Sequence, residues 1–171
     1  SKWIWTPEMA AGTAPEGRRW FRKVLTAPEG KTPIYAHILS RAEDVHGFFV
    51  NGRAVGSSSP LSVLNWVCVA LRPYHNVFAV KAINTGGPAG VLATIQVTYA
   101  DGTTSTVVTD ASWRFKQTFE PGSDTATFDD AHWGTAFVLP NETTTADGMM
   151  WPVMLPCAAS ISPGTCETIA V

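Results

Sequence analysis

The chain has 171 residues and is 45% apolar, with seven Trp and eight Phe, which is enough material for the core of one domain. Its formal net charge is -2 and it holds no block of Lys and Arg, so the composition argues against nucleic acid or an anionic membrane as a partner. No apolar run approaches the roughly 20 residues of a membrane-spanning helix. The composition therefore predicts a globular domain and no membrane insertion.

Short alternating or apolar runs bounded by turn residues recur along the chain, whereas helical periodicity is scarce. The predicted strands are Trp3–Trp5, Arg19–Leu25, Ile34–Ala42, Gly47–Val50, Arg53–Gly56, Val67–Leu71, Asn76–Ile83, Ala93–Tyr99, Ser105–Thr109 and Trp113–Lys116. This pattern predicts an all-β protein. Strands of this length and spacing suit a β-sandwich, in which two sheets bury alternate residues against each other.

Two turns are predicted from their residues. Asn51-Gly52 lies in "GFFVNGRAVG" and supplies the two positive-φ residues of a type I′ hairpin turn. Asp101-Gly102 in "TYADGTTST" is expected to do the same. The segments Thr6–Gly17 and Gly56–Asn65 are rich in turn formers and are predicted to be surface loops.

Two segments follow the last predicted strand. "FDDAHW" is predicted to be a tight turn or one helical turn, in which Asp129 or Asp130 caps backbone N–H groups. The tail from about residue 140 ends in "MMWPVMLP" and the cysteine-bounded segment. We interpret its apolar stretch as a closing strand, with a homodimer contact as the alternative.

The segment "KAINTGGPAG" separates two of the predicted strands. A hairpin needs only about two loop residues, yet this connection carries an Asn, a Gly-Gly-Pro turn and a further Gly. The residues allow two interpretations. One is a long turn of no special role, and the other is a loop that presents oxygen atoms to a ligand or a metal ion.

Several features favour a secreted protein. The chain starts at Ser1 without Met, which fits removal of a signal peptide or a start chosen for recombinant expression. Cys157 and Cys166 bracket a short Pro/Gly-bearing segment, and a disulfide between them is the preferred interpretation, with two reduced thiols as the alternative. Cys68 is then the odd cysteine and is expected to be a small buried apolar side chain. Asn141 begins a sequon for N-glycosylation.

The order of motifs resembles a known fold. These motifs are "WIWTPE", "RRWFRKVLTAPEG", "AHILSRAEDVHGFFVNGRAVG", "LRPYHNVFAVKAINTGGPAGVLATIQVTYADGTTSTVVTDASWRF" and "FDDAHW". Together they resemble a galactose-binding-like β-jelly roll, in particular the calcium-dependent rhamnose-binding module attached to bacterial α-L-rhamnosidases. The resemblance extends from about Lys2 to Trp133. It implies a non-catalytic carbohydrate-binding domain, a lectin or free-standing module, whose site lies in loops at one end of the sandwich.

The resemblance also implies site residues. An acidic or amide pair before the "VNG" hairpin contacts sugar hydroxyls, and here that pair is Glu43 and Asp44. The loop "NTGGPAG" helps to hold a calcium ion that touches the sugar, and the expected metal ligands are Asp44, Asn84, Gly87 and Pro88. This chain has Glu43-Asp44 where the family pattern reads Asp-Asn or Asp-Asp, which leaves the identity of the sugar and of the ion open.

The residue types suit this chemistry. Calcium takes 6 to 8 oxygen ligands at about 2.3–2.6 Å from carboxylates, amides, carbonyls and hydroxyls, and Asn84 with the surrounding glycines offers such oxygens. A sugar also needs an aromatic face. Trp66 and His46 adjoin polar loops and are the preferred candidates to contact the sugar, with Tyr74 and Trp151 as further ones. The remaining Trp residues in strand or turn patterns are expected to be core.

Catalysis is not expected. Glycosidases need two carboxylates placed across one bond, whereas Glu43-Asp44 and Asp129-Asp130 are sequence neighbours, which point to opposite faces of an extended chain. No nucleophile elbow, zinc motif or phosphate loop is present. The sequence thus predicts binding of a terminal rhamnose or galacto-configured sugar. A protein-interaction module that has lost the sugar site is the first alternative, and a polysaccharide-acting enzyme is the second.

Overall fold

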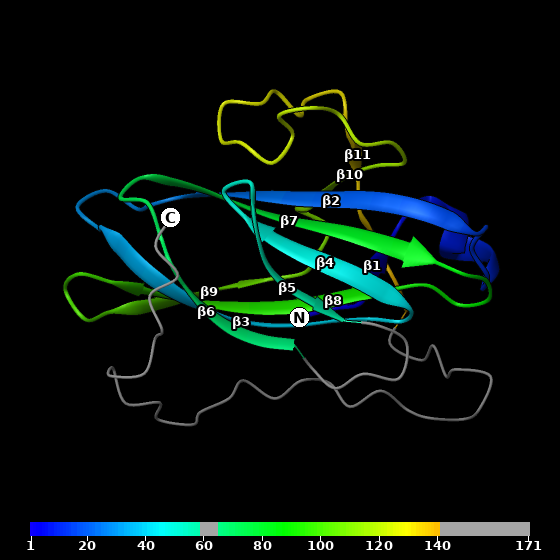
Figure 1. Ribbon diagram of the computed structural model, residues 1–171, viewed down its shortest axis with the longest axis horizontal. Coiled ribbons are helices and arrows are strands. Elements are labelled where there is room, and N and C mark those ends of the chain that lie inside the picture. Colours follow the sequence, from blue (N-terminus) through cyan, green and yellow to red (C-terminus); the bar gives the residue numbers. More distant parts are fainter. Residues whose placement is uncertain (59–64, 141–171) are drawn as a thin grey trace.

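The structure is a sandwich of two antiparallel β-sheets (Figure 1), in a computed structural model that describes residues 1–58 and 65–140. Sheet A has the order β12-β1-β8-β3-β6 with β9 paired to β8, and its strands are β1 (Ile4–Trp5), β3 (Pro33–Ala42), β6 (Asn65–Ala70), β8 (Val91–Tyr99), β9 (Thr104–Val108) and β12 (Phe137–Val138). Sheet B has the order β11-β10-β2-β7-β4-β5, and its strands are β2 (Gly17–Thr26), β4 (Val45–Val50), β5 (Arg53–Ser58), β7 (His75–Asn84), β10 (Arg114–Lys116) and β11 (Gly134–Thr135).

The all-β prediction is confirmed. Each strand predicted from the sequence coincides with an observed strand, and the ends differ by one or two residues. The two-residue strands β11 and β12 were not predicted, because two residues are too few to show a period. The segment expected to be a loop from Thr6 to Gly17 also contains a short 3-10 helix, η1 (Pro7–Ala11), with Pro7 at its start.

The core lies between the sheets. Alternate residues of the long central strands point inward, and Phe21, Phe48 and Phe78 of sheet B meet Ile38 and Ile95 of sheet A with no exposed surface. Burying a large apolar side chain fully contributes about 1.5–3 kcal/mol. The period-2 pattern of the sequence is therefore the main determinant of the fold.

The two predicted hairpin turns differ. Asn51 and Gly52 both have positive φ, 51° and 85°, so the type I′ prediction is confirmed. At the second turn Gly102 has positive φ and Asp101 does not. There the Asp101 side chain accepts a hydrogen bond from the Thr103 N–H at 3.0 Å, so the turn is built by an aspartate side chain and not by a second positive-φ residue.

The connection from β7 to β8 is not a hairpin. β7 lies in the middle of sheet B and β8 lies in sheet A, so residues 85–90 cross from one sheet to the other. A crossing between layers needs more chain than a hairpin, because packed sheets lie about 10 Å apart. The crossing from sheet B to sheet A therefore explains part of the length of "NTGGPAG".

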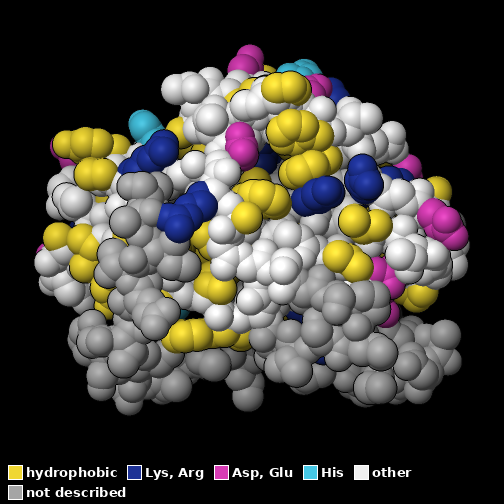
Figure 2. All heavy atoms as spheres, in the orientation of Figure 1, with side chains coloured by type: hydrophobic (Ala, Val, Ile, Leu, Met, Phe, Trp, Pro, Cys, Tyr) yellow, Lys and Arg dark blue, Asp and Glu magenta, His cyan; other side chains and the backbone are white. Residues whose placement is uncertain are grey.

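The segment from residue 117 to residue 133 covers the outer face of sheet B, above β2, β7 and β4 (Figure 1). Arg22 of β2 holds it there. The Arg22 guanidinium is 1% exposed, donates to the Thr125 carbonyl at 2.9 Å and pairs with Asp130. Asp129 caps the following turn through the Ala131 N–H at 2.9 Å, so the predicted capping role is confirmed for Asp129. In the same view, Figure 2 shows hydrophobic side chains beside Lys and Arg side chains on this part of the surface.

Several predictions concern residues outside the described ranges. These are the Cys157–Cys166 disulfide, the Asn141 sequon, Trp151, the closing strand or dimer contact in "MMWPVMLP", and most of the Gly56–Asn65 loop. Cys68 lies on β6, is half-buried and is disulfide-bonded, so the prediction that it is an unpaired and fully buried cysteine is wrong. Within residues 1–58 and 65–140, no helix is long and apolar enough to cross a membrane.

Candidate functional site

Two crossings between the sheets meet at one end of the sandwich. Glu43 and Asp44 join β3 of sheet A to β4 of sheet B, and residues 85–90 join β7 of sheet B to β8 of sheet A. The Glu43 N–H donates to the Gly90 carbonyl at 3.0 Å, and the Thr85 N–H donates to Asp44 Oδ2 at 2.6 Å. The structure therefore brings together three of the residues predicted for the site, Glu43, Asp44 and Asn84. They line a narrow recess, too small to admit a water molecule, together with Trp5, Ala42, Ala82, Ile83, Ala89 and Gly90.

The Asn84 side chain is held from below the loop. Asn84 is 2% exposed, and its Nδ2 donates to the carbonyls of Ala14 and Pro15 at 2.9 and 3.2 Å. Because these two bonds occupy Nδ2, the other amide atom, Oδ1, faces the loop. Oδ1 accepts a 3.3 Å bond from the Gly86 N–H, so one of its two lone pairs is left for a further partner.

Glycines shape the loop above Asn84. Gly86 and Gly87 have φ of 131° and 77°, values that side-chain-bearing residues rarely adopt. The Gly87 carbonyl accepts from the Ala14 N–H at 3.1 Å, and Pro88 is half-buried. At Gly90 an added Cβ would lie 2.7 Å from the Trp3 ring, so the absence of a side chain is required for this approach. The loop is thus a fixed turn held against Ala14.

Two features of the site were missed from the sequence. The segment Ala14–Glu16 was assigned to a surface loop, but it supplies both carbonyls that orient Asn84, and Glu16 Oε1 lies 3.6 Å from where a Gly86 Cβ would stand. Trp5 belongs to the core, as predicted, but its place beside the recess was not foreseen. It is 1% exposed and lines the recess, and its Nε1 has no hydrogen-bond partner among the described residues. A buried indole N–H without an acceptor is rare.

Two other predicted contact residues lie elsewhere. His46 is 1% exposed, points into the core and shares a 3.0 Å hydrogen bond with Ser40 Oγ. Burial lowers the pKa of His46 to about 4, so it is a neutral interior group, and the prediction that it contacts a sugar is corrected. Trp66 is 46% exposed on the outer face of sheet A, where it stacks on His37 with ring centroids 5.4 Å apart. It does not line the recess.

The side chains around the recess can be compared with the oxygen ligands that calcium requires. No group of three or more His, Cys, Asp or Glu side chains gathers as a metal site within the described ranges. The recess instead offers the Asp44 carboxylate and the open lone pair of Asn84, both hard oxygen donors. Gly87 and Pro88, the other predicted ligands, do not line it. These fit calcium better than a transition metal. They supply too few ligands alone, so water or ligand hydroxyls would complete the shell.

Two kinds of known protein are similar to this chain. No family model matches the chain. The chain is 32% identical over 81% of its length to an α-L-rhamnosidase of Streptomyces avermitilis, of which it covers 14%. A structure of the S. avermitilis enzyme complexed with L-rhamnose matches with a TM-score of 0.66 and 31% identity.

A lectin from Pleurotus ostreatus is also similar. Its apo form has 43% identity and a TM-score of 0.77, and its complex with GalNAc has 42% identity and a TM-score of 0.78. The resemblance to the galactose-binding-like β-jelly roll of α-L-rhamnosidases is confirmed. Because this chain covers 41–42% of the lectin chains and 14% of the enzyme, it corresponds to one segment of each.

Proposed function

We propose that this jelly roll binds a terminal sugar reversibly and without catalysis, through the recess formed by Glu43, Asp44 and Asn84. The observation that carries the proposal is the meeting of the two sheet crossings, which fixes Asp44 against Thr85 and leaves an Asn84 lone pair open beside it. A chain that is 42–43% identical to a lectin supports the same function. Carboxylate and amide oxygens in fixed positions are the groups that accept hydrogen bonds from sugar hydroxyls.

We further propose that calcium links the sugar to the loop. Asp44, Asn84 and the carbonyls of Gly87 and Pro88 would hold it, and calcium would supply positive charge that attracts vicinal hydroxyl oxygens. The chain's own part is to fix these oxygens. The Ala14 and Pro15 carbonyls orient Asn84, and the Thr85 N–H orients Asp44.

The order in which sugars should be tested follows from the similarities. Identity is higher to the lectin, which has been solved with GalNAc, than to the rhamnosidase, which has been solved with L-rhamnose. We therefore expect a galacto-configured terminal sugar to bind more tightly than L-rhamnose. A single hydroxyl mispaired in a site built of polar groups costs enough affinity to separate the two.

The test is a glycan array probed with the full chain in calcium and again in EDTA, followed by titration of the best sugar against Asp44→Asn. We expect binding to one class of terminal sugar, loss in EDTA, and at least a tenfold weaker affinity for Asp44→Asn. Asp110→Asn, in the turn after β9, is the matched control and should bind as wild type. Binding that survives EDTA would retain the lectin and reject calcium. Absence of binding would favour a protein-interaction module, and release of product from an oligosaccharide would favour an enzyme.

A further inference from the structure

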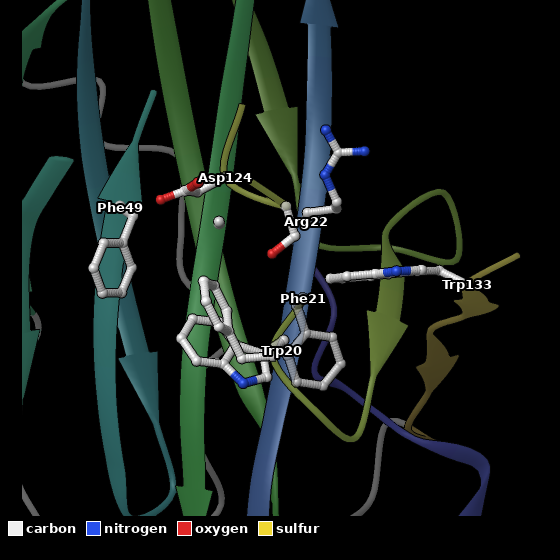
Figure 3. A pocket seen from close by; sticks show the side chains of 9 residues that line it. Trp20, Phe21, Arg22, Phe49, Asp124 and Trp133 are labelled. Carbon is white, nitrogen blue, oxygen red and sulfur yellow. The ribbon is translucent and has the colours of Figure 1, made fainter. Parts of the chain in front are cut away.

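A second pocket lies far from the sheet-end recess, on the outer face of sheet B. Its cavity of about 110 Å³ opens between the strands and the segment from residue 117 to residue 133. The wall includes Trp20 of β2 and Phe49 of β4 on one side, and Phe119, Ser123, Asp124 and Trp133 on the other. In Figure 3, Trp20, Phe49 and Asp124 surround an opening, and the Asp124 carboxylate is turned toward Phe49.

Aromatic rings form a fixed platform in this pocket. The Trp20 ring lies 4.6 Å from Phe119 and 6.3 Å from Phe49, measured between centroids. Phe119 is 47% exposed although it belongs to this cluster. A rigid aromatic surface left open to water, beside a cavity, is typical of a ligand site and not of a closed core.

Polar groups without protein partners gather at the same place. The half-buried Asp124 carboxylate makes no hydrogen bond or ion pair with any residue in the described ranges. The Ser123 hydroxyl, on a residue 3% exposed, has no partner in those ranges either. Arg22 also lines the pocket, and its buried Nε is unpaired among the described atoms. Of these three, only Arg22 Nε is a fully buried atom that lacks a partner, which is rare. The Asp124 carboxylate and the Ser123 hydroxyl line the cavity without a bond to a described residue, so an occupant with both donors and acceptors would find partners here.

Neighbouring acidic groups show that the lack of partners is specific to this pocket. On the same segment Glu120 binds Lys116, His132 and Trp133, Asp129 caps a turn, and Asp130 pairs with Arg22. Asp124 alone among these four acidic side chains has no such bond within the part of the chain described. Its carboxylate is therefore the group that a ligand would meet first.

The local charge selects against a cation. An aromatic cluster with one carboxylate could hold an ammonium group, but Lys81 Nζ already lies 5.7 Å from the Trp20 centroid, and the Arg22 guanidinium lies in the same wall. The Lys81 ammonium would repel a second positive charge on this ring, whereas the Arg22 charge is compensated by its ion pair with Asp130. A neutral molecule with one apolar face and several hydroxyl groups fits better, because its C–H face packs on the rings and its hydroxyls donate to Asp124.

We propose that this pocket is a second, calcium-independent sugar subsite that takes one neutral pyranose unit on Trp20 and Phe119 and binds its hydroxyls through Ser123 and Asp124. Ala79 lines the pocket, and Asn84 of the sheet-end recess lies five residues farther along the same strand, about 17 Å away at 3.4 Å per residue. A single chain then carries two sugar contacts. Glycans that reach both gain avidity without a dimer.

The experiment uses the full chain, ¹⁵N-labelled, titrated in EDTA with methyl α-D-N-acetylgalactosaminide, methyl α-L-rhamnopyranoside and a panel of neutral pyranoses, while the Trp side-chain N–H signals are followed. We expect at least one sugar to shift the Trp20 signal in a saturable way. Asp124→Asn, which breaks no bond to a described residue, should weaken this binding at least tenfold. Phe119→Ala should do the same.

Matched variants separate this subsite from the recess. Asp129→Asn, five residues away on the same segment, should leave EDTA-resistant binding unchanged, and Asp44→Asn should reduce only the calcium-dependent binding. If no pyranose in the panel shifts Trp20, or if Asp124→Asn binds as wild type, the subsite is rejected. Saturable shifts with tetramethylammonium alone would also overturn it. None of these three outcomes would affect the proposed sugar site at the recess or its calcium test.

Discussion

Strand β7 has a buried asparagine near each end, and the two are used differently. Asn76 is fully buried, and its Oδ1 accepts from Asn51 Nδ2 at 2.9 Å and from the Arg72 N–H at 2.8 Å. Asn84 is equally inaccessible, but its Oδ1 accepts a single 3.3 Å bond from the Gly86 N–H. The acceptor of Asn76 is saturated by the protein, and that of Asn84 is not.

The other polar groups near each end of β7 are used in the same two ways. Around Asn76, the Asn51-Gly52 turn closes on β7 through Asn51 Oδ1 and the Val77 N–H. Around Asn84, the Trp5 N–H lacks a partner in the described ranges, and the recess adds the carboxylates of Glu43 and Asp44. One end of the sandwich therefore uses its polar groups to hold the fold. The other holds some of them in place for a partner.

The sharpest test of this division replaces each asparagine with alanine. Asn76→Ala removes the partner of Asn51 Nδ2 and of both backbone groups of Arg72, at the edge of the interior, and we expect the free energy of unfolding to fall by about 3 kcal/mol. Urea denaturation measures this change. The folded fraction should still bind sugar with wild-type affinity, because Asn76 lies at the opposite end of β7 from the recess.

Asn84→Ala provides the counterpart. It unpairs the Ala14 and Pro15 carbonyls, so we expect a loss of about 2 kcal/mol together with loss of calcium-dependent sugar binding. If Asn76→Ala abolished sugar binding in protein shown to be folded, or if Asn84→Ala bound normally, the functional division between the two ends would be wrong.

Lowering the pH should destabilise the recess end of the sandwich before the opposite end. His46 lies just after the Glu43-Asp44 crossing and bonds to Ser40 just before it, and burial lowers its pKa to about 4 from an ordinary 6.5. Between these values the unfolded chain binds the proton and the folded chain does not. Stability therefore rises with pH in this window, and roughly 3 kcal/mol is lost as the pH falls from 6.5 to 4.

This prediction is checked by urea denaturation at several pH values, with His46→Gln as the comparison. The variant cannot titrate at this position, so its curve should be flatter than that of wild type between pH 6.5 and 4. As the pH is lowered, the protection of backbone amides against hydrogen exchange, relative to their intrinsic rates, should fall near Ser40 and Asp44 before it falls near Asn51. Parallel curves for the two proteins would mean that His46 does not govern this loss.

The segment from residue 117 to residue 133 offers a third region for comparison, because its Asp130 holds the fold as Asn76 does. Asp130→Asn keeps a hydrogen-bond acceptor but removes the charge that compensates the buried Arg22 guanidinium, and we expect a loss of about 2 kcal/mol. Asp129→Asn is the matched control, since an amide oxygen can still accept from the Ala131 N–H. Equal melting temperatures for the two variants would show that the Arg22 pair contributes nothing to holding the segment.

The sequence predicted the strands because period-2 alternation and Asn-Gly turns are local signals. It also predicted that Glu43, Asp44 and Asn84 share a site, but this came from the resemblance, since the residues alone left a long turn as an alternative. The assignment of β7 and β8 to different sheets is a non-local property. For that reason the structural role of residues 85–90 could not be read from the chain.

The missed residues share a physical cause. Ala14 and Pro15 act through backbone carbonyls, which carry no signature in the side-chain sequence. Trp20 and Phe119 come together across most of the chain, and nothing in either local pattern indicates the other. His46 was misplaced because a histidine after a polar turn looks exposed, whereas its alternation with Phe48 directs it inward.

The smallest expected effect concerns Trp66, which the sequence favoured as the sugar-stacking residue. Trp66→Ala should change stability by no more than about 0.5 kcal/mol, because the ring lies 46% exposed on the outer face of sheet A. Sugar affinity should stay within a factor of two of wild type. Burial lowers the pKa of His37, on which the Trp66 ring stacks, so removing the ring should let the His37 pKa rise toward its ordinary value, as followed by NMR titration. A tenfold loss of sugar affinity with an unchanged His37 pKa would instead return Trp66 to the binding site.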